Sequence, residues 1–381
     1  MALVLFLISM AGGDPDSLKQ FLVGGDISAL SVIEKYGGIF RDQGKSDDAI
    51  KIMTRYGSNC FRLRLFVDPT RRNVVVNDLP YTIALAQRIK AAGAKLLLNF
   101  HYSDTWADPA HQNKPKAWQN LAFAKLENKV FEYSRDCIAE FKKANVMPDF
   151  IQPGNEITPG MLWPDGKLYG LGEPEQQWGK FTRLLKAGIR GIKTASPEKP
   201  PRIVIHIDCG GDWSKTKWFF QHIEKHIVPY DIIGLSYYPW WHGSLADLKT
   251  NLQNCAATFK KDIFVVETAY PYKPMKIPQK NAEKSMAYSM TPQGQKDFLS
   301  DLIRTVKAIP DRRGIGVLWW YPESIPAANL RIWNAGKTAL FDQTGNPLPA
   351  LKQLTGNGKL LIDMNPLSLY KYLLLEMNTR C

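Results

Sequence analysis

The chain has 381 residues, of which 45% are hydrophobic and 22% are charged, and lysine plus arginine exceed aspartate plus glutamate by 13. This is an ordinary globular composition, long enough for one large domain or two small ones. The basic residues are spread along the sequence and form no stripe interleaved with aromatics, so we expect no nucleic-acid partner.

The first residues, "MALVLFLISMAGG", contain about ten apolar residues followed by small ones. A bilayer span needs about 20 apolar residues, so this segment is too short to cross a membrane. It fits a signal peptide over residues 1–13, with cleavage near Ala11–Gly13. It lacks the usual basic start, and a mis-assigned start is the alternative. We expect a secreted or periplasmic protein that acts as a monomer.

Runs with the character of buried strands recur along the whole chain. They are residues 21–28, 59–67, 95–103, 149–156, 202–208, 231–239, 262–271 and 314–322. Each is nearly continuous in apolar residues, which is typical of parallel strands covered on both faces.

Segments of helical period lie between these runs, at residues 77–93, 121–145, 291–309 and 348–354. In 291–309, Phe298, Leu302 and Val306 recur every four residues, with Thr291 as N-cap and Pro292 at the first helical position. Eight strands alternating with helices predict an α/β fold, a (β/α)8 TIM barrel formed as a single catalytic domain over residues 20–354.

The alternative fold is a doubly wound open sheet, which would usually carry a Gly-rich phosphate turn after its first strand. "GGDIS" is not such a turn, and no cofactor is expected. Residues 355–381 are a C-terminal extension whose order the sequence does not decide. The five cysteines show no metal or disulfide pattern.

Polar and aromatic residues gather where the predicted strands end, which is where barrels carry their chemistry. They are Arg64, His101, Asn155, Glu156, His206, Asp208, Tyr238, Glu267 and Trp320. Each has a structural reading: Arg62 and Arg64 share a strand face and could form a buried ion-pair network, and a lone histidine or tryptophan usually packs in a core. Their common position on different strands favours a site.

Two glutamates end apolar strands, Glu156 on the fourth and Glu267 on the seventh. These strands lie across the barrel mouth from each other, so both carboxyl groups can face one bond. A pair of carboxyl groups flanking a bond is the equipment of glycoside hydrolysis. One protonates the leaving oxygen, and the other attacks if the gap is about 5–5.5 Å or activates water if it is about 6.5–9.5 Å.

Tryptophans near the strand ends offer faces on which sugar rings stack. They are Trp106, Trp118, Trp163, Trp213, Trp240 and Trp241. For each, packing within a loop is an equally good reading. Polar neighbours such as Asp104, Asp108, His111, Asp212 and His242 could hold sugar hydroxyls.

Several longer strings make the sequence recognisable: "FHYSDTWADPAHQ" (100–112), "GNEITPGMLWPDG" (154–166), "GLSYYPWWHGSLADL" (234–248) and "VVETAYP" (265–271). They resemble the arabinogalactan endo-β-1,4-galactanases of glycoside hydrolase family 53. The resemblance runs from "GGDIS" to Leu354 and implies a retaining barrel enzyme that cleaves galactan or arabinogalactan internally.

The resemblance also implies residue roles. Glu156 is similar to the acid/base and Glu267 to the nucleophile, while Asn155 would hold the sugar 2-hydroxyl. Arg64 and Tyr238 would lie beside Glu267 and keep it ionised. The substrate-binding residues would be His101, Asp104, Trp106, His206, Asp208, Trp240, His242 and Trp320.

The chain departs from the family pattern in places. Where the family reads "YWEPAWIP", this chain reads "WWYPESIP", with Tyr321 in place of a glutamate and Ser324 in place of a tryptophan. Bacterial members often bind calcium through clustered acids after the seventh strand, but residues 272–290 offer only Glu283. Hard cations need several oxygen ligands, so we expect no metal.

Two alternatives stay open at this stage. One is a related β-1,4-glycanase that acts on mannan or glucan, because the carboxylate pair would be shared. The other is a polysaccharide-binding barrel without activity, which would be expected to lose a carboxylate or its partners.

Overall fold

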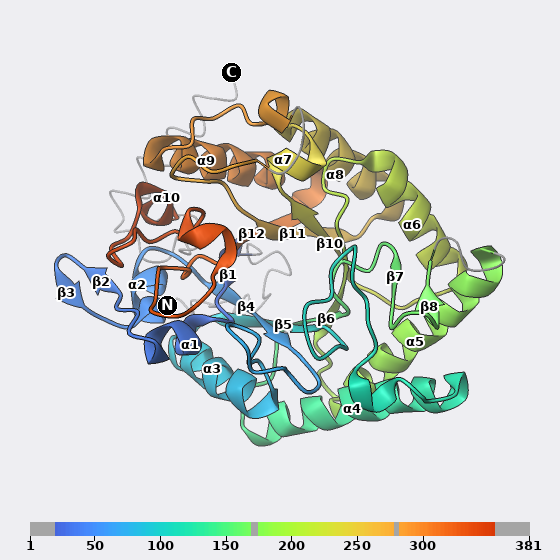
Figure 1. Cartoon of the computed structure of the whole chain (residues 1–381). Helices are drawn as coiled ribbons and strands as arrows, with labels where there is room; N and C mark the ends of the chain where they lie inside the picture. Colours follow the sequence, from blue (N-terminus) through green and yellow to red (C-terminus); the bar gives the residue numbers. More distant parts are fainter. Residues whose placement is uncertain (1–19, 169–173, 278–281, 355–381) are drawn as a thin grey trace, which may run out of the picture.

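The computed structural model describes residues 20–168, 174–277 and 282–354, and it shows a closed barrel of parallel strands ringed by helices (Figure 1). The strands follow one another around the barrel in the order β1-β12-β11-β10-β9-β6-β5-β4. All the pairings between them are parallel. The predicted (β/α)8 fold is therefore confirmed.

The barrel strands agree with the predicted runs within a few residues at each end. They are β1 (Leu22–Asp26), β4 (Cys60–Leu65), β5 (Lys95–Phe100), β6 (Phe150–Pro153), β9 (Arg202–Ile207), β10 (Ile232–Tyr237), β11 (Asp262–Thr268) and β12 (Gly314–Trp320). Two short hairpins, for which the sequence shows no strand pattern, lie in the loops: β2 (Arg41–Asp42) with β3 (Lys45–Ser46), and β7 (Gly160–Met161) with β8 (Gly166–Lys167).

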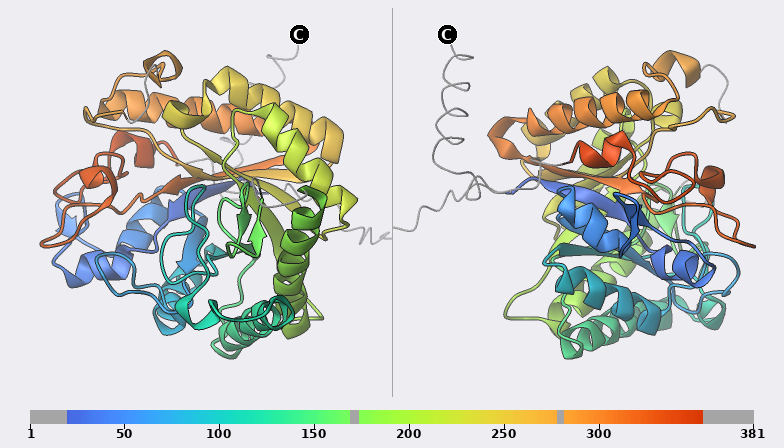
Figure 2. Two further views of the ribbon diagram at one scale, coloured as in Figure 1. Left: turned by 45° about the vertical axis from the view of Figure 1, so that its right-hand side comes forward. Right: turned by 90° about the vertical axis from the view of Figure 1, so that its left-hand side faces the viewer.

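The helices form an outer layer around the strands, as the two turned views show (Figure 2). The α-helices are α1 (Leu30–Lys35), α2 (Ala49–Arg55), α3 (Leu79–Ala91), α4 (Phe123–Lys143), α5 (Pro174–Ala195), α6 (Trp213–Lys225), α7 (Pro239–His242), α8 (Leu245–Phe259), α9 (Pro292–Lys307) and α10 (Pro349–Lys352). Four 3-10 turns are η1 (Lys116–Trp118), η2 (Ala282–Ser285), η3 (Pro310–Arg312) and η4 (Trp333–Gly336). The predicted cap of α9 is confirmed, since the Thr291 hydroxyl accepts from the Gly294 amide at 3.1 Å.

Alternation along each strand divides the core in two. On β4, the outward residues Phe61, Leu63 and Leu65 join the large cluster between strands and helices. The inward residues Cys60, Arg62 and Arg64 climb the inside of the barrel, and all three are fully buried. The barrel interior thus begins apolar at one end and becomes charged toward the carboxyl ends of the strands.

A lower, apolar layer of the interior draws side chains from all eight strands, among them Leu22, Cys60, Leu97, Phe150, Val204, Ile232, Phe264 and Leu318. An upper layer lies above it and is polar: Asp26, Arg62, Asn99, Gln152, His206, Ser236 and Glu267, all at most 4% exposed. The lower layer packs the barrel, and the upper layer is the floor of the mouth.

Some predictions fall outside the described residues. They are the signal peptide over 1–13 and the extension over 355–381, and they stay predictions. Within the part of the chain that the structure describes, no helix is both long enough and apolar enough to cross a membrane.

Candidate active site

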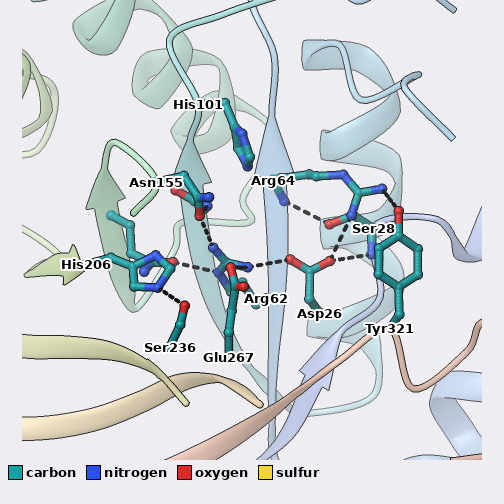
Figure 3. Close-up of polar contacts among 12 residues, drawn as sticks. Asp26, Ser28, Arg62, Arg64, His101, Asn155, His206, Ser236, Glu267 and Tyr321 are labelled. Atoms are coloured by element: carbon teal, nitrogen blue, oxygen red, sulfur yellow. Dashed lines mark hydrogen bonds and ion pairs between the residues drawn. The ribbon is translucent and has the colours of Figure 1, made fainter. Parts of the chain in front are cut away.

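Arg62 is the centre of the upper layer (Figure 3). Its Nη1 lies 2.7 Å from Glu267 Oε1 and 3.0 Å from Asp26 Oδ2. Nη2 donates to Asn155 Oδ1 at 2.7 Å, and Nε donates to Gln152 Oε1 at 2.6 Å. A buried guanidinium is costly to desolvate, and two carboxylates together with two amide oxygens offset that cost.

Glu267 reaches this layer through an irregularity in β11. On β10, Leu235 pairs with Val265 but the next residue, Ser236, pairs with Glu267. On β12, the pairing likewise jumps from Val317–Val265 to Trp319–Thr268. Val266 already faces the barrel interior, so regular alternation would turn Glu267 outward. The bulge re-aims it into the mouth.

Two contacts hold the Glu267 carboxylate. Tyr238 donates its hydroxyl to Oε2 at 3.0 Å, and Arg62 pairs with Oε1. Burial raises the pKa of Glu267, while the charge of Arg62 and the hydrogen bond from Tyr238 act against that rise. This environment favours the ionised form more than burial alone would.

Glu156 is placed differently. Its φ of 47° lies in the left-handed region, which turns the chain sharply after β6. Its Oε1 accepts from the Ser236 hydroxyl at 2.6 Å, and its amide faces His206 Nδ1 at 3.5 Å. Burial raises its pKa well above the usual value, and the negative charges of Glu267 and Asp208 raise it further.

His206 completes a chain of hydrogen bonds to Glu156. The imidazole lies 2.8 Å from the Ser236 hydroxyl through Nε2. Because Nδ1 accepts from the Glu156 amide, Nε2 carries the proton and donates to Ser236, which in turn donates to the carboxyl group. Burial holds the pKa of His206 well below its usual value, so the ring is a neutral relay.

The Asn155 amide is fixed in one orientation. Its Oδ1 accepts from Arg62 and from Asn99 Nδ2, each at 2.7 Å. Its Nδ2 donates to the Ala107 carbonyl at 2.7 Å. Nδ2 has a second hydrogen to offer, and Asn155 lies on the cleft wall. This is the donor that a sugar hydroxyl would need.

One expectation about Glu267 differs from the structure. The ion pair that we expected from Arg64 is made by Arg62. Arg64 Nη1 instead lies 3.4 Å from Asp26, and its Nη2 donates to the Tyr321 hydroxyl at 2.9 Å. Its guanidinium lies over the Trp106 ring, 4.5 Å from the centroid. Arg64 therefore braces the floor of the mouth beside Glu267.

A cleft of about 1300 Å³ crosses the mouth, and both glutamates line it. Of the thirteen residues to which the resemblance gives a role, eight lie in its wall: Trp106, Asn155, Glu156, Asp208, Tyr238, His242, Glu267 and Trp320. Four further candidates for sugar contacts also line it: Asp108, Asp212, Trp213 and Trp241. The structure thus brings together, in one cleft, residues from six of the barrel strands and the loops that follow them.

Four predicted substrate-binding residues do not belong to the cleft wall of the described structure. His101 and His206 are buried beneath it, at 3% and 0% exposure. Asp104 accepts from the backbone amides of Asp68 and Lys116, so it organises loops. Trp240 is 1% exposed, and its neighbour Trp241 lines the cleft instead.

Other residues at the site were missed or left without a role. Ser236 gives a weak signal in sequence, because a serine inside an apolar strand is usually only a small core residue. Trp333 follows the last strand and packs near Trp241, with ring centroids 6.4 Å apart. Because Trp333 lies in an irregular segment, the sequence around it shows neither helical nor strand periodicity. Trp241 is one of six tryptophans that the sequence offers for sugar stacking, and nothing in the sequence singles it out from its neighbour Trp240.

Metal-binding geometry is absent from the described residues, where no three His, Cys, Asp or Glu side chains gather closely enough to hold an ion. Residues 278–281 of the loop after β11 lie outside the described part. The expectation of no metal in that loop therefore stays a prediction.

A parallel eight-stranded barrel with two carboxyl groups buried at its mouth has the features of a (β/α)8 glycosidase. The model of the protein family described as "Glycosyl hydrolase family 53" matches residues 22–354 of this chain. The chain belongs to this family and is a glycosidase.

Individual relatives are similar to this chain over most of its length. The chain is 39% identical to an uncharacterised protein of Niallia circulans, aligned over 88% of this chain and 94% of the relative. It is 34% identical to the arabinogalactan endo-β-1,4-galactanase of Thermothelomyces thermophilus, over 86% and 97%. A solved structure from work on two fungal β-1,4-galactanases matches with a TM-score of 0.79 at 32% identity, covering 88% of this chain and 99% of that one.

Proposed function

We propose that the protein is an endo-acting, retaining β-1,4-galactanase that cleaves galactan or arabinogalactan side chains. The observation that carries this proposal is the contrast between two carboxyl groups in one cleft. Glu156 is held protonated by burial and by neighbouring negative charge, while Glu267 is paired with Arg62 and Tyr238. Pairs whose environments separate their pKa values mark an acid and a nucleophile.

The chemistry follows from these two environments. Glu267 attacks the anomeric carbon, and the bond to the leaving oxygen breaks as Glu156 donates its proton to that oxygen. A covalent glycosyl–Glu267 ester results. Glu156, now a carboxylate, takes a proton from water, the water oxygen attacks the anomeric carbon, and Glu267 leaves as a carboxylate. Asn155 Nδ2 would hold the 2-hydroxyl while charge develops on the sugar ring.

The relatives support the substrate. Those named by activity are arabinogalactan endo-β-1,4-galactanases, and they align over most of this chain. The Trp320 ring, 9% exposed beneath the cleft, offers an apolar face to a sugar above the two glutamates.

The test is a product profile on linear β-1,4-galactan, with mannan and cellulose in parallel and with the anomer followed by NMR. We expect oligosaccharides of mixed length, released first as the β-anomer, from galactan alone. Release of the α-anomer first would contradict Glu267 as nucleophile. Faster release from mannan or cellulose would overturn the substrate, and no release from any of the three would favour a binding protein.

A further inference from the structure

The two ends of the cleft differ in charge. One end lies among the loops after β9 and β10, where Lys215 is 3.6 Å from Asp212 and so carries a local counter-charge. The other end lies among the loops after β4 and β12, where Arg72 and Arg331 line the wall. Figure 1 shows β4 and β12 on either side of β1, so these two loops are neighbours on the rim.

Arg72 and Arg331 form what we call the cationic end of the cleft. Both are exposed. The loops that carry them touch, since the Arg331 amide lies 3.4 Å from Asn73 Oδ1. Within the described residues, no carboxylate lies within ion-pairing distance of either guanidinium. The adjacent Arg71, by contrast, is paired with Asp78 at 2.7 Å.

The proposed roles of the two glutamates orient the substrate in the cleft. The proton donor stands on the side of the leaving group. The Glu156 carboxyl group is held from the side of β9 and β10, through His206 and Ser236, whereas Glu267 is held from β4 by Arg62. The leaving portion of the chain therefore lies toward the end with Lys215 and Asp212. The non-reducing portion extends the other way, over Trp320, to the cationic end.

We infer that the cationic end is a subsite for a sugar carboxylate, so that the enzyme accepts a galactan chain carrying a uronic acid on its non-reducing side. A neutral galactose needs hydroxyl partners, not two guanidinium groups without counter-charge. Arginine presents forked donors that match a carboxylate in a bidentate geometry. This inference rests on the proposed galactanase function and specifies the substrates of the same cleft.

The test compares two sets of aryl β-1,4-galacto-oligosaccharides, from trimer to pentamer. One set is neutral. In the other, the non-reducing galactose is oxidised at C6 to the uronate. We expect the wild type to favour the uronate at the length that reaches the cationic end, by roughly three- to tenfold in kcat/KM at low salt, because the contact is charge-assisted but exposed. The gain should lie in KM, because the contact is distant from the reacting bond.

The decisive variant is Arg72→Gln with Arg331→Gln. It should lose the preference for the uronate and keep its turnover of the neutral oligosaccharides. The matched control, Lys142→Gln with Lys249→Gln, removes two exposed cations from α4 and α8 and should keep the preference. Added salt should reduce the preference of the wild type and the control alike.

The outcomes separate the two proposals. A wild type without the preference, or an arginine variant that retains it, overturns the inference. So does a control variant that loses it, because the effect would then come from net charge. If the wild type released no aryl group from any neutral oligosaccharide, the proposed galactanase function itself would fall.

Discussion

The two layers inside the barrel are built by the same strands and yet differ in kind. On β5 the lower layer has Leu97 and the upper layer has Asn99, and on β9 the two residues are Val204 and His206. On these two strands the upper residue lies only two positions further along, whereas on β1 and β10 it lies four positions further. A change of residue type between nearby inward positions of one strand thus turns a packed core into a catalytic floor.

This difference separates two tasks. Apolar side chains in the lower layer gain free energy from burial alone. The charged groups of the upper layer lose hydration on burial. For Arg62 this cost is offset by its contacts with two carboxylates and two side-chain amides. The layers should therefore respond differently to mutation: the lower in stability, the upper in activity.

The sharpest test exchanges one residue from each layer. Glu267→Ala should reduce turnover of galactan by roughly 10⁴-fold or more, because no nucleophile remains. Its melting temperature should change little, since Arg62 keeps Asp26 as a partner. Val204→Ala should do the reverse, lowering the free energy of unfolding by about 1–3 kcal/mol while the folded enzyme retains its kcat.

Kinetics on galactan and thermal melts of both variants check this crossing. Loss of activity in Val204→Ala at a temperature where it is fully folded would show that the lower layer also serves the chemistry.

Glu156→Ala should have the next largest effect, and one that depends on the leaving group. Loss of the acid should slow cleavage of galactan by roughly 10²- to 10⁴-fold. An aryl glycoside with a good leaving group needs little protonation, so its glycosylation step should suffer far less. The measurement is the ratio of kcat/KM for the two substrates, and equal losses on both would contradict the role of Glu156 as acid.

The fold was predictable because its signals are strong and local. Eight apolar runs stand between helical segments, and each became a strand of the barrel. The hairpins β2–β3 and β7–β8 were not predictable, because each strand is two residues long and is held by its surrounding loop. A pair of residues has no periodicity to recognise.

The sequence predicted which strand ends carry the site. It did not predict which of the residues there contact one another. Arg62 and Arg64 share a face of β4, and which one reaches Glu267 depends on the bulge in β11, which no local pattern announces. Trp240 and Trp241 lie on the short helix α7, where successive side chains point about 100° apart. Only the helix decides that Trp241 faces the cleft.

A smaller effect is expected from Ser236→Ala, within the upper layer. The hydroxyl donates to Glu156 Oε1 and so favours its ionised form. Without this bond the pKa of Glu156 should rise, and the alkaline limb of the kcat/KM profile should move to higher pH by up to about one unit. We expect kcat at the optimum to fall by roughly tenfold or less, because the carboxyl group loses its positioning contact through His206.

Ser134→Ala is the matched control for this variant. That serine is also buried, but it bonds the Tyr102 hydroxyl at 2.7 Å from helix α4, outside the barrel. Its pH profile should stay that of the wild type. An alkaline limb that does not move in Ser236→Ala would show that the hydroxyl does not tune Glu156.

Glu323 sharpens the comparison, because it is polar and fully buried but does not line the cleft. Its Oε1 accepts from the Ala29 amide at 3.0 Å, and no hydrogen-bond partner for Oε2 is found among the described residues. Burial, with the charge of Asp26, raises its pKa to about 8. The family pattern has its glutamate at the position of Tyr321. In this chain the carboxyl group whose pKa the charge of Arg64 influences comes two residues later, at Glu323.

The raised pKa has a defined consequence for stability. Between about pH 4.5 and pH 8 the folded protein keeps the proton on Glu323, whereas the unfolded chain has released it. Stability therefore falls as the pH rises through this window, by up to about 1.4 kcal/mol per pH unit from this group. Glu323→Gln keeps the acceptor for Ala29 and cannot ionise. Relative to the wild type, its melting temperature should rise by a few degrees from pH 5 to pH 8.

Enzyme activity is the second measurement on Glu323→Gln. It separates a role in catalysis that requires contact with the cleft from a role that requires only a place in the floor of the barrel mouth. If lining the cleft is what matters, Glu323→Gln should retain wild-type kcat/KM near pH 6, and only the pH dependence of melting should change. Glu140→Gln, an exposed position on α4, should change neither. A large fall in kcat in Glu323→Gln would mean that the floor acts as one electrostatic unit, from Asp26 and Arg64 through Arg62 to Glu267. If the melting temperatures of Glu323→Gln and the wild type changed with pH in parallel, Glu323 would be ionised in the folded protein across this range.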